Sequence, residues 1–219
     1  MIRQVIWDFN GTLLDDVSLC LNIINTMLEK RHLKPLTLDN YGDMFDFPVE
    51  KYYRSVGFDM SKEPFPILAQ EYMDQYQPAS FTCRLREGVP QILDALMKTN
   101  VRQVLLSATN RNILLAQVAF FGIGLYFDPI LGLDDILGKS KRDLAGQWFS
   151  SQTILPEETI LVGDTIHDHD VAQRIGCQSI LLTGGHNSRA RLTASGDRVL
   201  DHPAAILDAF FPIGESRTW

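Results

Sequence analysis

The sequence has few cysteines, no long apolar run and no basic stretch, and each absence removes a class of protein. Cys20, Cys83 and Cys177 are far apart and form no CxxC pair, so we expect small buried thiols in a reducing compartment. No stretch is apolar for long enough to span a bilayer, and no signal-peptide pattern opens the chain. We therefore expect a cytoplasmic protein without a membrane partner.

Positive charge is also scarce. Acidic residues number 27 against 20 lysines and arginines, which gives a net charge of −7. Without a basic stripe, nucleic acid is not an expected partner, and an anionic substrate requires local help from a metal or a few placed cations. No GxGxxG follows the first apolar run, which argues against a dinucleotide-binding fold. The 219 residues suit one large domain or a domain with an insertion, as a monomer or a homodimer.

An apolar run that stops at a carboxylate is the most informative feature of the chain. Residues 5–7 are typical of a buried strand, and Asp8 follows directly, with Gly11 three residues on. A strand that ends in Asp and a tight turn delivers that carboxylate to the edge of the sheet where open α/β proteins bind ligands. Asp8 is therefore a candidate nucleophile or metal ligand.

About seventy residues of helical spacing follow this strand and contain no convincing strand. The expected helices begin at Val17 with Asp15 or Asp16 as the cap, and cover residues 48–57 and 67–76. An all-helical block placed directly after the first strand predicts a cap domain, which we assign to residues 15–84.

Strands and helices alternate from Glu87 onward. The expected strands are 101–106, 127–131, 159–162, 179–182 and 198–200. Alternation of this kind implies right-handed βαβ units and a parallel sheet. The predicted fold class is therefore α/β, with a Rossmann-like parallel-sheet core of residues 1–14 and 85–219 and an inserted helical cap.

Three of the expected strands end in reactive side chains: Asp8, Ser107 and Asp164. Because parallel strands share one carboxyl edge, these side chains converge if their strands are neighbours. Lys141 stands at a fourth strand-to-helix junction. Asp168 begins the helix after Asp164, so both carboxylates can face one cation, and carboxylates at a loop suit Mg²⁺.

The order of these motifs resembles the haloacid dehalogenase-like superfamily, and most closely its phosphoglycolate-phosphatase-like members with a helical cap. The residues that carry this resemblance are Asp8-Phe9-Asn10-Gly11-Thr12-Leu13, Ser107, Lys141 and Gly163-Asp164 with Asp168. The resemblance implies a Mg²⁺-dependent phosphatase that acts on a small phosphorylated metabolite. Asp8 would attack phosphorus and form an aspartyl-phosphate that water later hydrolyses.

The resemblance also assigns supporting roles. Ser107 would hydrogen-bond a phosphoryl oxygen, and Lys141 would stabilise the transferring group, with Lys139 as the alternative lysine. The implied metal ligands are Asp8, the backbone carbonyl of Asn10, Asp164 and Asp168. The implied substrate contacts are Gly11, Thr12 and Ala108.

Asn10 departs from the usual pattern, which has Asp two residues after the nucleophile as the general acid and base. An amide cannot transfer a proton at neutral pH, and general acid–base catalysis contributes about 10²–10⁴-fold. Either the leaving group is a good one, or His32 or His167 supplies the proton, or the enzyme is slow. Two further alternatives are cleavage of a C–P or C–halogen bond and a binding scaffold with weak or no catalysis. The C–P reading requires a Schiff-base lysine, for which Lys30, Lys34 and Lys51 are candidates.

Two other segments are candidates for substrate recognition. The aromatic run 41–48 is typical of a loop that shapes a substrate pocket or of a helix connection that packs on itself. A second anionic group on the substrate would need a cation from the helical block, and the candidates are Arg31, Lys34, Lys51 and Arg54. The glycines of the turn 183–187 are expected to serve backbone geometry rather than phosphate binding.

Overall fold

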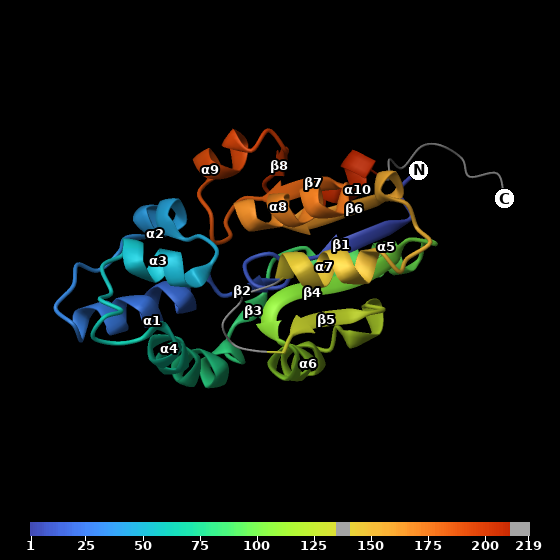
Figure 1. The fold of residues 1–219 in the computed structure, drawn as a ribbon. Coiled ribbons are helices and arrows are strands. Elements are labelled where there is room, and N and C mark those ends of the chain that lie inside the picture. The colour runs from blue at the N-terminus through green and yellow to red at the C-terminus, as the bar shows by residue number, and fades with distance from the viewer. Residues whose placement is uncertain (135–140, 211–219) are drawn as a thin grey trace.

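The computed structural model describes residues 1–134 and 141–210, and it places a six-stranded sheet beside a group of helices (Figure 1). The sheet order is β5-β4-β1-β6-β7-β8, and every neighbouring pair is parallel. The strands are β1 (Gln4–Trp7), β4 (Arg102–Asn110), β5 (Ile130–Leu133), β6 (Thr159–Gly163), β7 (Gln178–Leu182) and β8 (Arg198–Leu200). This architecture confirms the predicted α/β fold class.

Helices cover both faces of the sheet, which explains why Val5, Ile6 and Trp7 of β1 are apolar at successive positions. Val5 and Trp7 pack on one face with α5 (Val89–Met97), α6 (Arg111–Phe120) and α10 (Ala205–Phe210). Ile6 packs on the other face with α7 (Lys141–Phe149) and α8 (Ile166–Ile175). Parallel sheets buried on both faces require apolar side chains at successive positions.

A second apolar cluster holds the helical block together at one end of the sheet (Figure 1). The block consists of α1 (Val17–Glu29), α2 (Leu38–Met44), α3 (Val49–Ser55) and α4 (Phe65–Ser80). Its chain enters and leaves through a two-stranded antiparallel pair, β2 (Leu14–Asp15) and β3 (Arg84–Leu85).

Helix α4 is longer than the predicted 67–76, because neither flanking proline ends it. Pro66 lies in the first turn, where its missing N–H leaves no hydrogen bond unmade. Pro78 lies within the last turn of the helix.

The segment after β7 contacts the helical block. The Ser188 N–H donates to the carbonyl of Gly42 over 2.9 Å, and the Asn187 amide donates to the carbonyl of Phe45 over 2.8 Å. Ser188 also caps α9 (Arg189–Ala194), whose Arg191 lies 3.5 Å from Asp46. This segment therefore joins the sheet to the helical block by contacts that are separate from the chain connection.

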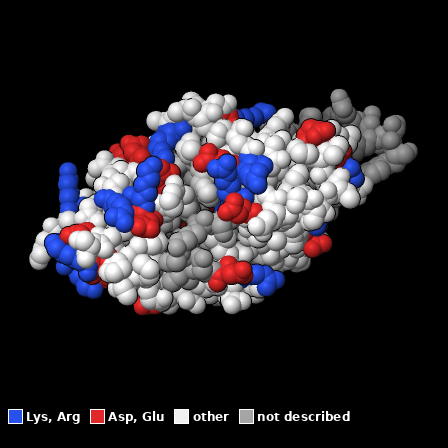
Figure 2. Space-filling view, viewed as in Figure 1, with Lys and Arg blue, Asp and Glu red and all other residues white. Residues whose placement is uncertain are grey.

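The remaining short elements are the 3-10 turns η1 (Gly124–Tyr126) and η2 (Pro156–Glu158). Among the helices of residues 1–134 and 141–210, none has both the length and the apolarity to cross a membrane. Basic and acidic side chains lie interspersed on the face of the molecule shown in Figure 2.

Candidate active site

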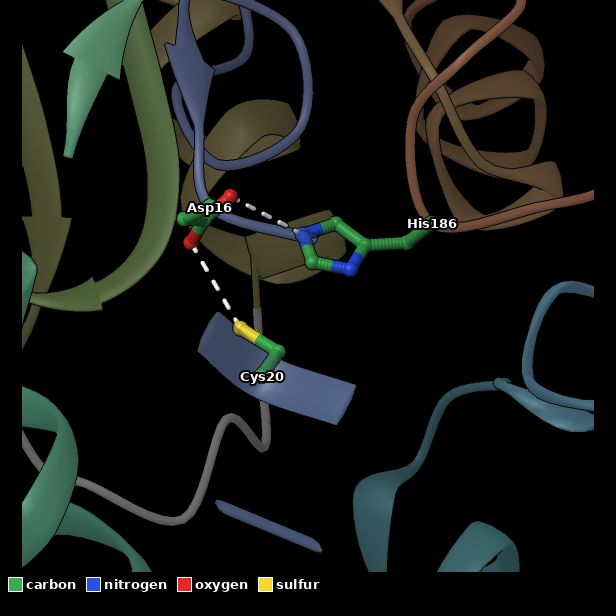
Figure 3. Close-up of side chains that lie close together, drawn as sticks. All are labelled: Asp16, Cys20 and His186. Atoms are coloured by element: carbon green, nitrogen blue, oxygen red, sulfur yellow. Dashed lines mark hydrogen bonds and ion pairs between the residues drawn. The ribbon is translucent and has the colours of Figure 1, made fainter. Parts of the chain in front are cut away.

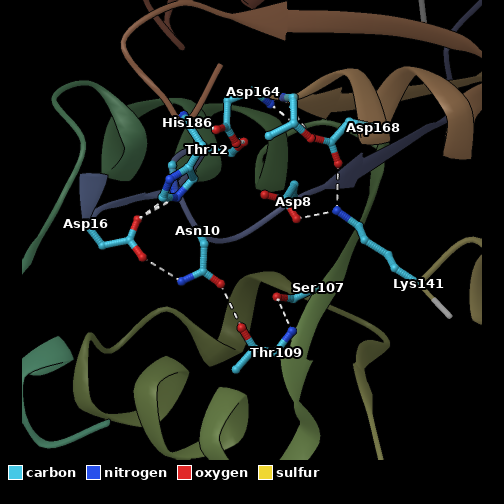
Figure 4. A network of polar contacts seen from close by, with 12 residues as sticks. Asp8, Asn10, Thr12, Asp16, Ser107, Thr109, Lys141, Asp164, Asp168 and His186 are labelled. Atoms are coloured by element: carbon cyan, nitrogen blue, oxygen red, sulfur yellow. Dashed lines mark hydrogen bonds and ion pairs between the residues drawn. The ribbon is translucent and has the colours of Figure 1, made fainter. Parts of the chain in front are cut away.

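Asp8, Lys141 and Asp168 meet at the carboxyl edge of the sheet (Figure 4). Asp8 follows β1, Lys141 is the first residue of α7, and Asp168 lies in the first turn of α8. The Lys141 Nζ donates to Asp8 Oδ1 and, over 2.6 Å, to Asp168 Oδ1. All three side chains are buried, so the lysine is committed to these two carboxylates. Lys139, the alternative lysine, lies outside the described residues.

Asp164 completes a cluster of three carboxylates. One oxygen of each of Asp8, Asp164 and Asp168 lies within 4.8 Å of the others. The Asp164 oxygens accept hydrogen bonds from Thr12 Oγ1 (2.5 Å) and from the His186 N–H (2.6 Å). These bonds fix the carboxylate and leave it lone pairs for a cation.

Asp168 has a structural task beside its contact with Lys141. Its Oδ2 accepts hydrogen bonds from the Thr165 N–H (3.0 Å) and hydroxyl (2.7 Å), which is a capping box at the start of α8. Both oxygens of Asp168 are therefore engaged, and the residue positions Lys141 as well as facing the acidic cluster.

The cluster carries more negative than positive charge. Burial raises the pKa of Asp8 well above its ordinary value; Lys141 opposes this shift, and the charges of Asp168 and Asp164 add to it. Burial raises the pKa of Asp164 as well, with Asp168 contributing. Burial favours neutral Asp168 and Lys141 too, but their mutual attraction lowers the pKa of Asp168 and raises that of Lys141. A divalent cation would offset the remaining negative charge.

Ser107 reaches the same edge from an irregular part of β4. The strand was expected to end before Ser107, yet it continues to Asn110, with a register shift against β5 between Leu106 and Asn110. The Ser107 hydroxyl accepts from the Thr109 N–H over 3.0 Å. Because pairing is disrupted here, four successive residues from Ser107 onward line one cavity.

The side chain of Asn10 is held by three neighbours. Its amide nitrogen donates to Asp16 Oδ2 (2.8 Å) and contacts the Tyr76 hydroxyl (2.6 Å), and its oxygen accepts from Thr109 Oγ1 (2.7 Å). These bonds assign the amide orientation and direct its N–H groups at a carboxylate.

Asp16, which with Asp15 was predicted only as a candidate cap of α1, belongs to the site. It occupies the N-cap position, but its side chain accepts no capping hydrogen bond from the helix backbone. Its oxygens instead accept from Asn10, from the Gly11 N–H (2.9 Å) and from the Tyr76 hydroxyl (2.8 Å). Sequence reasoning missed this role because Asp before a helix already has an ordinary local explanation.

His186 is a second residue that sequence reasoning missed. Its Nε2 lies 3.3 Å from Asp16 Oδ1, its Nδ1 lies 2.8 Å from the Tyr41 hydroxyl, and Cys20 approaches Asp16 from the other side (Figure 3). Burial lowers the pKa of His186, but the charge and hydrogen bond of Asp16 outweigh it and raise the pKa to about 9. His186 in turn holds the pKa of Asp16 below its ordinary value against the effect of burial. The pair is therefore ionic at neutral pH.

Gly11 and Thr12 lie behind this surface rather than on it. Gly11 has a φ of +72°, and a Cβ there would stand 2.3 Å from Asp164 Oδ2, so only glycine fits. Arg86 donates to the Gly11 carbonyl (2.7 Å) and to the Thr183 carbonyl (2.5 Å), which ties the two loops together. Neither Gly11 nor Thr12 lines the cavity, whereas Ala108 does.

A cavity of about 170 Å³ lies between the sheet edge and the helical block. Its polar end contains Asp8, Asn10, Ser107, Lys141 and Asp168. Its other end is lined by side chains of the helical block, among them Tyr41, Phe45, Phe47, Tyr52, Tyr53, Phe65, Tyr72 and Tyr76. The aromatic segment 41–48 thus contributes to the cavity wall.

The two histidines considered as proton donors are placed differently. His167 lines the cavity, where its ring stacks on Phe47, and burial lowers its pKa. His32 is exposed and does not line it. Of the two, only His167 is placed to meet a substrate.

The basic residues expected to meet a second anion or form a Schiff base do not line the cavity. Arg31 is bound by Glu63 and Glu71 over 2.5–2.6 Å. The other basic residues that were candidates are Lys30, Lys34, Lys51 and Arg54. None of them lines the cavity. None of the three lysines proposed for C–P cleavage is therefore in place to form a Schiff base with a substrate in this cavity.

A parallel α/β sheet with carboxylates and a lysine gathered at its carboxyl edge, under a helical block, defines a class of hydrolytic enzyme. The sequence model of the haloacid dehalogenase-like hydrolase family matches residues 5–182, so the chain belongs to this family. This match confirms the resemblance derived from the motifs.

Individual relatives agree with the family assignment. A phosphoglycolate phosphatase from Synechococcus elongatus is 24% identical over 209 residues, which cover 95% of this chain and 97% of that protein. A haloacid dehalogenase-like hydrolase from Streptococcus pneumoniae has a similar fold, with a TM-score of 0.80, 20% identity and coverage of 95% and 98% of the two chains. A family hydrolase from Deinococcus radiodurans, solved with bound phosphate and sodium, has a TM-score of 0.70, 20% identity and coverage of 95% and 94%. The chain is thus a hydrolase with phosphatases among its relatives.

Proposed function

We propose that the protein is a Mg²⁺-dependent phosphatase that hydrolyses a small phosphorylated metabolite through an aspartyl-phosphate. The observation that supports this most directly is the convergence of Asp8, Asp164 and Asp168 within 4.8 Å, with Lys141 as the amine between two of them. Buried carboxylate oxygens without enough positive charge fit a hard divalent cation.

Asp8 is the nucleophile in this proposal. One of its oxygens forms a bond to phosphorus while the bond between phosphorus and the leaving oxygen breaks. Water then attacks the phosphorus of the acyl-phosphate, which releases inorganic phosphate and regenerates Asp8. Lys141 lowers the repulsion between Asp8 and the phosphoryl group, and Ser107 donates its hydroxyl to a phosphoryl oxygen.

Asp8, Asp164, Asp168 and the carbonyl of Asn10 would hold the metal, which neutralises charge between the two anions when bound. We also propose that residues 15–84 act as a cap that closes over the bound ester and excludes water. The separate apolar cluster of α1–α4 and the contacts of Ser188 and Asn187 with α2 and the loop after it support this role.

The test is release of inorganic phosphate by the purified protein from acetyl phosphate and a panel of esters, with Mg²⁺ and with EDTA. We expect release with Mg²⁺ only, and its loss in Asp8→Asn. Asp15→Asn is the matched control, because Asp15 is an exposed carboxylate in the same segment. Release that persists in EDTA or in Asp8→Asn contradicts the proposal.

A further inference from the structure

The end of the cavity that is lined by the helical block, here called the far end, has the lining expected for an uncharged ring. Its wall is mostly aromatic, and Ile24, Val49, Ala69 and Met73 are its aliphatic members. The whole cavity, with its polar end included, has a volume of about 170 Å³, close to that of the roughly 150 Å³ cavity known to bind benzene, so its far end has room for no more than one small ring. A compact apolar group fills such a space, because burial of its surface is favourable.

Charge at this end argues against a substrate with a second anionic group. Within the described part of the lining, Lys141 is the one lysine or arginine, and Asp8 and Asp168 already bind it. Both ring nitrogens of His186 are already engaged, by Asp16 and Tyr41. A carboxylate buried here would lack a partner, which is strongly unfavourable.

Two buried polar atoms of lining residues have no hydrogen-bond partner within residues 1–134 and 141–210. They are the Tyr52 hydroxyl and Nε2 of His167, and Tyr52 itself is 2% exposed. A buried polar group without a hydrogen bond carries a desolvation penalty that a ligand atom can relieve. Burial keeps the Tyr52 hydroxyl protonated, so it can donate a hydrogen bond to an uncharged polar substituent of a ligand.

Asn10 limits the leaving group independently of the cavity shape. The amide of Asn10 has no acidic proton to transfer to the leaving group. The departing oxygen must therefore be stable as an anion. A phenol has a pKa of about 10, as in the tyrosine side chain, whereas an alkoxide is far more basic. A phenolate therefore departs without an acid at position 10.

We propose that the substrate class is aryl phosphates, monoesters of a single uncharged aromatic ring with a neutral polar substituent. This inference rests on the phosphatase function proposed above. The Asp8 oxygen–phosphorus bond forms, the phosphorus–aryl oxygen bond breaks, and the electron pair leaves with the phenolate, which takes a proton from water. Water then hydrolyses the acyl-phosphate.

A substrate series tests the inference. Phenyl phosphate, benzyl phosphate, 2-phosphoglycolate and acetyl phosphate are compared with Mg²⁺ by steady-state phosphate release. We expect phenyl phosphate to exceed 2-phosphoglycolate in kcat/KM by about 10- to 100-fold, the cost of an unpaired buried polar group. Benzyl phosphate is expected to share the KM of phenyl phosphate and to have a lower kcat, because its alkoxide needs an acid.

The outcomes separate the two proposals. Release from acetyl phosphate with 2-phosphoglycolate equal to or better than phenyl phosphate overturns the aryl class and leaves the phosphatase standing. No release from any of the four compounds overturns the phosphatase itself.

A positive charge introduced into the cavity wall provides a second test of the preference for an uncharged ring. Val49→Lys places a cation among the lining residues, and we expect it to raise the KM for phenyl phosphate and lower that for 2-phosphoglycolate by about tenfold. Glu50→Lys is the control, since it adds a lysine to the same helix at a position that does not line the cavity. Equal effects of the two variants contradict the inference.

The Tyr52 hydroxyl is tested by Tyr52→Phe. We expect a KM about tenfold higher for 4-acetylphenyl phosphate, with that for phenyl phosphate unchanged, because only the first ester carries a hydrogen-bond acceptor on its ring. Tyr126→Phe, in η1 and outside the cavity lining, is the control. An unchanged KM for both esters in Tyr52→Phe overturns the polar-substituent part of the inference.

Discussion

The amide of Asn10 donates a hydrogen bond to the carboxylate of Asp16 over 2.8 Å, and both side chains line the cavity that contains Asp8. The usual phosphatase pattern of the family has the carboxyl group at position 10. In this chain the amide stands there, and the carboxylate lies beside it at position 16. Substitutions at positions 10 and 16 can therefore test whether a carboxyl group at position 10 speeds the reaction.

Asn10→Asp is expected to raise kcat for simple alkyl phosphates such as benzyl phosphate at least tenfold, because general acid catalysis contributes about 10²–10⁴-fold. The new carboxyl group would lie beside Asp16, so the two would share a proton, and one pKa would rise. Phenyl phosphate serves as the internal control, since its leaving group gains little from an acid.

The exchange variant Asn10→Asp with Asp16→Asn keeps one amide and one carboxyl group in contact. We expect it to be less stable to urea than Asn10→Asp alone, because the buried charge of His186 loses the carboxylate of Asp16. An unchanged benzyl phosphate rate in both variants would show that proton transfer is supplied elsewhere or does not limit turnover.

Lys141→Met is expected to lower phosphate release by at least 100-fold and to destabilise the metal-free protein. Breaking a buried ion pair costs about 3–5 kcal/mol, because the remaining charge is left uncompensated. The free energy of unfolding in urea with EDTA measures this effect. Lys98→Met is the control, since the Lys98–Asp94 pair is exposed and contributes little. Equal losses in the two variants would contradict the role given to Lys141.

Much of the site was predictable because its residues lie where strands meet turns or helices. Asp8, Asp164 and Lys141 follow from the alternation of elements, since a parallel sheet brings such junctions to one edge. Asp16 and His186 were not predictable in the same way. Each has an adequate local explanation, as a helix cap and as part of a glycine-rich turn, and only the packing of the helical block brings them together.

The extent of β4 illustrates the same limit for the fold. Local sequence places the end of the strand at Ser107, where the apolar run stops. Pairing of Asn110 with Leu133 of β5 extends the strand after an irregularity. Long-range pairing of this kind is not encoded in the periodicity of one segment.

Mg²⁺ is expected to raise the Tm of the protein by an amount that grows with the logarithm of its concentration above Kd. Binding to the folded state alone contributes about 2.7 kcal/mol at a concentration of 100 times Kd. Asp164→Asn should abolish the increase in Tm, whereas Asp170→Asn, an exposed carboxylate on α8, should preserve it. A similar increase in Asp164→Asn would place the cation elsewhere.

The ion pair of His186 and Asp16 predicts a loss of stability at alkaline pH. The folded-state pKa of His186 is about 9, above its ordinary 6.5. The stabilisation that protonated His186 gives the folded protein is therefore fully present below pH 6.5 and is lost as the pH rises to about 9. The measurement is the difference in unfolding free energy between the unmodified protein and His186→Gln, in EDTA, from pH 6 to 10. A shift of this size corresponds to a difference on the order of 3 kcal/mol at the acid end, and a difference independent of pH would show that His186 is neutral in the folded protein.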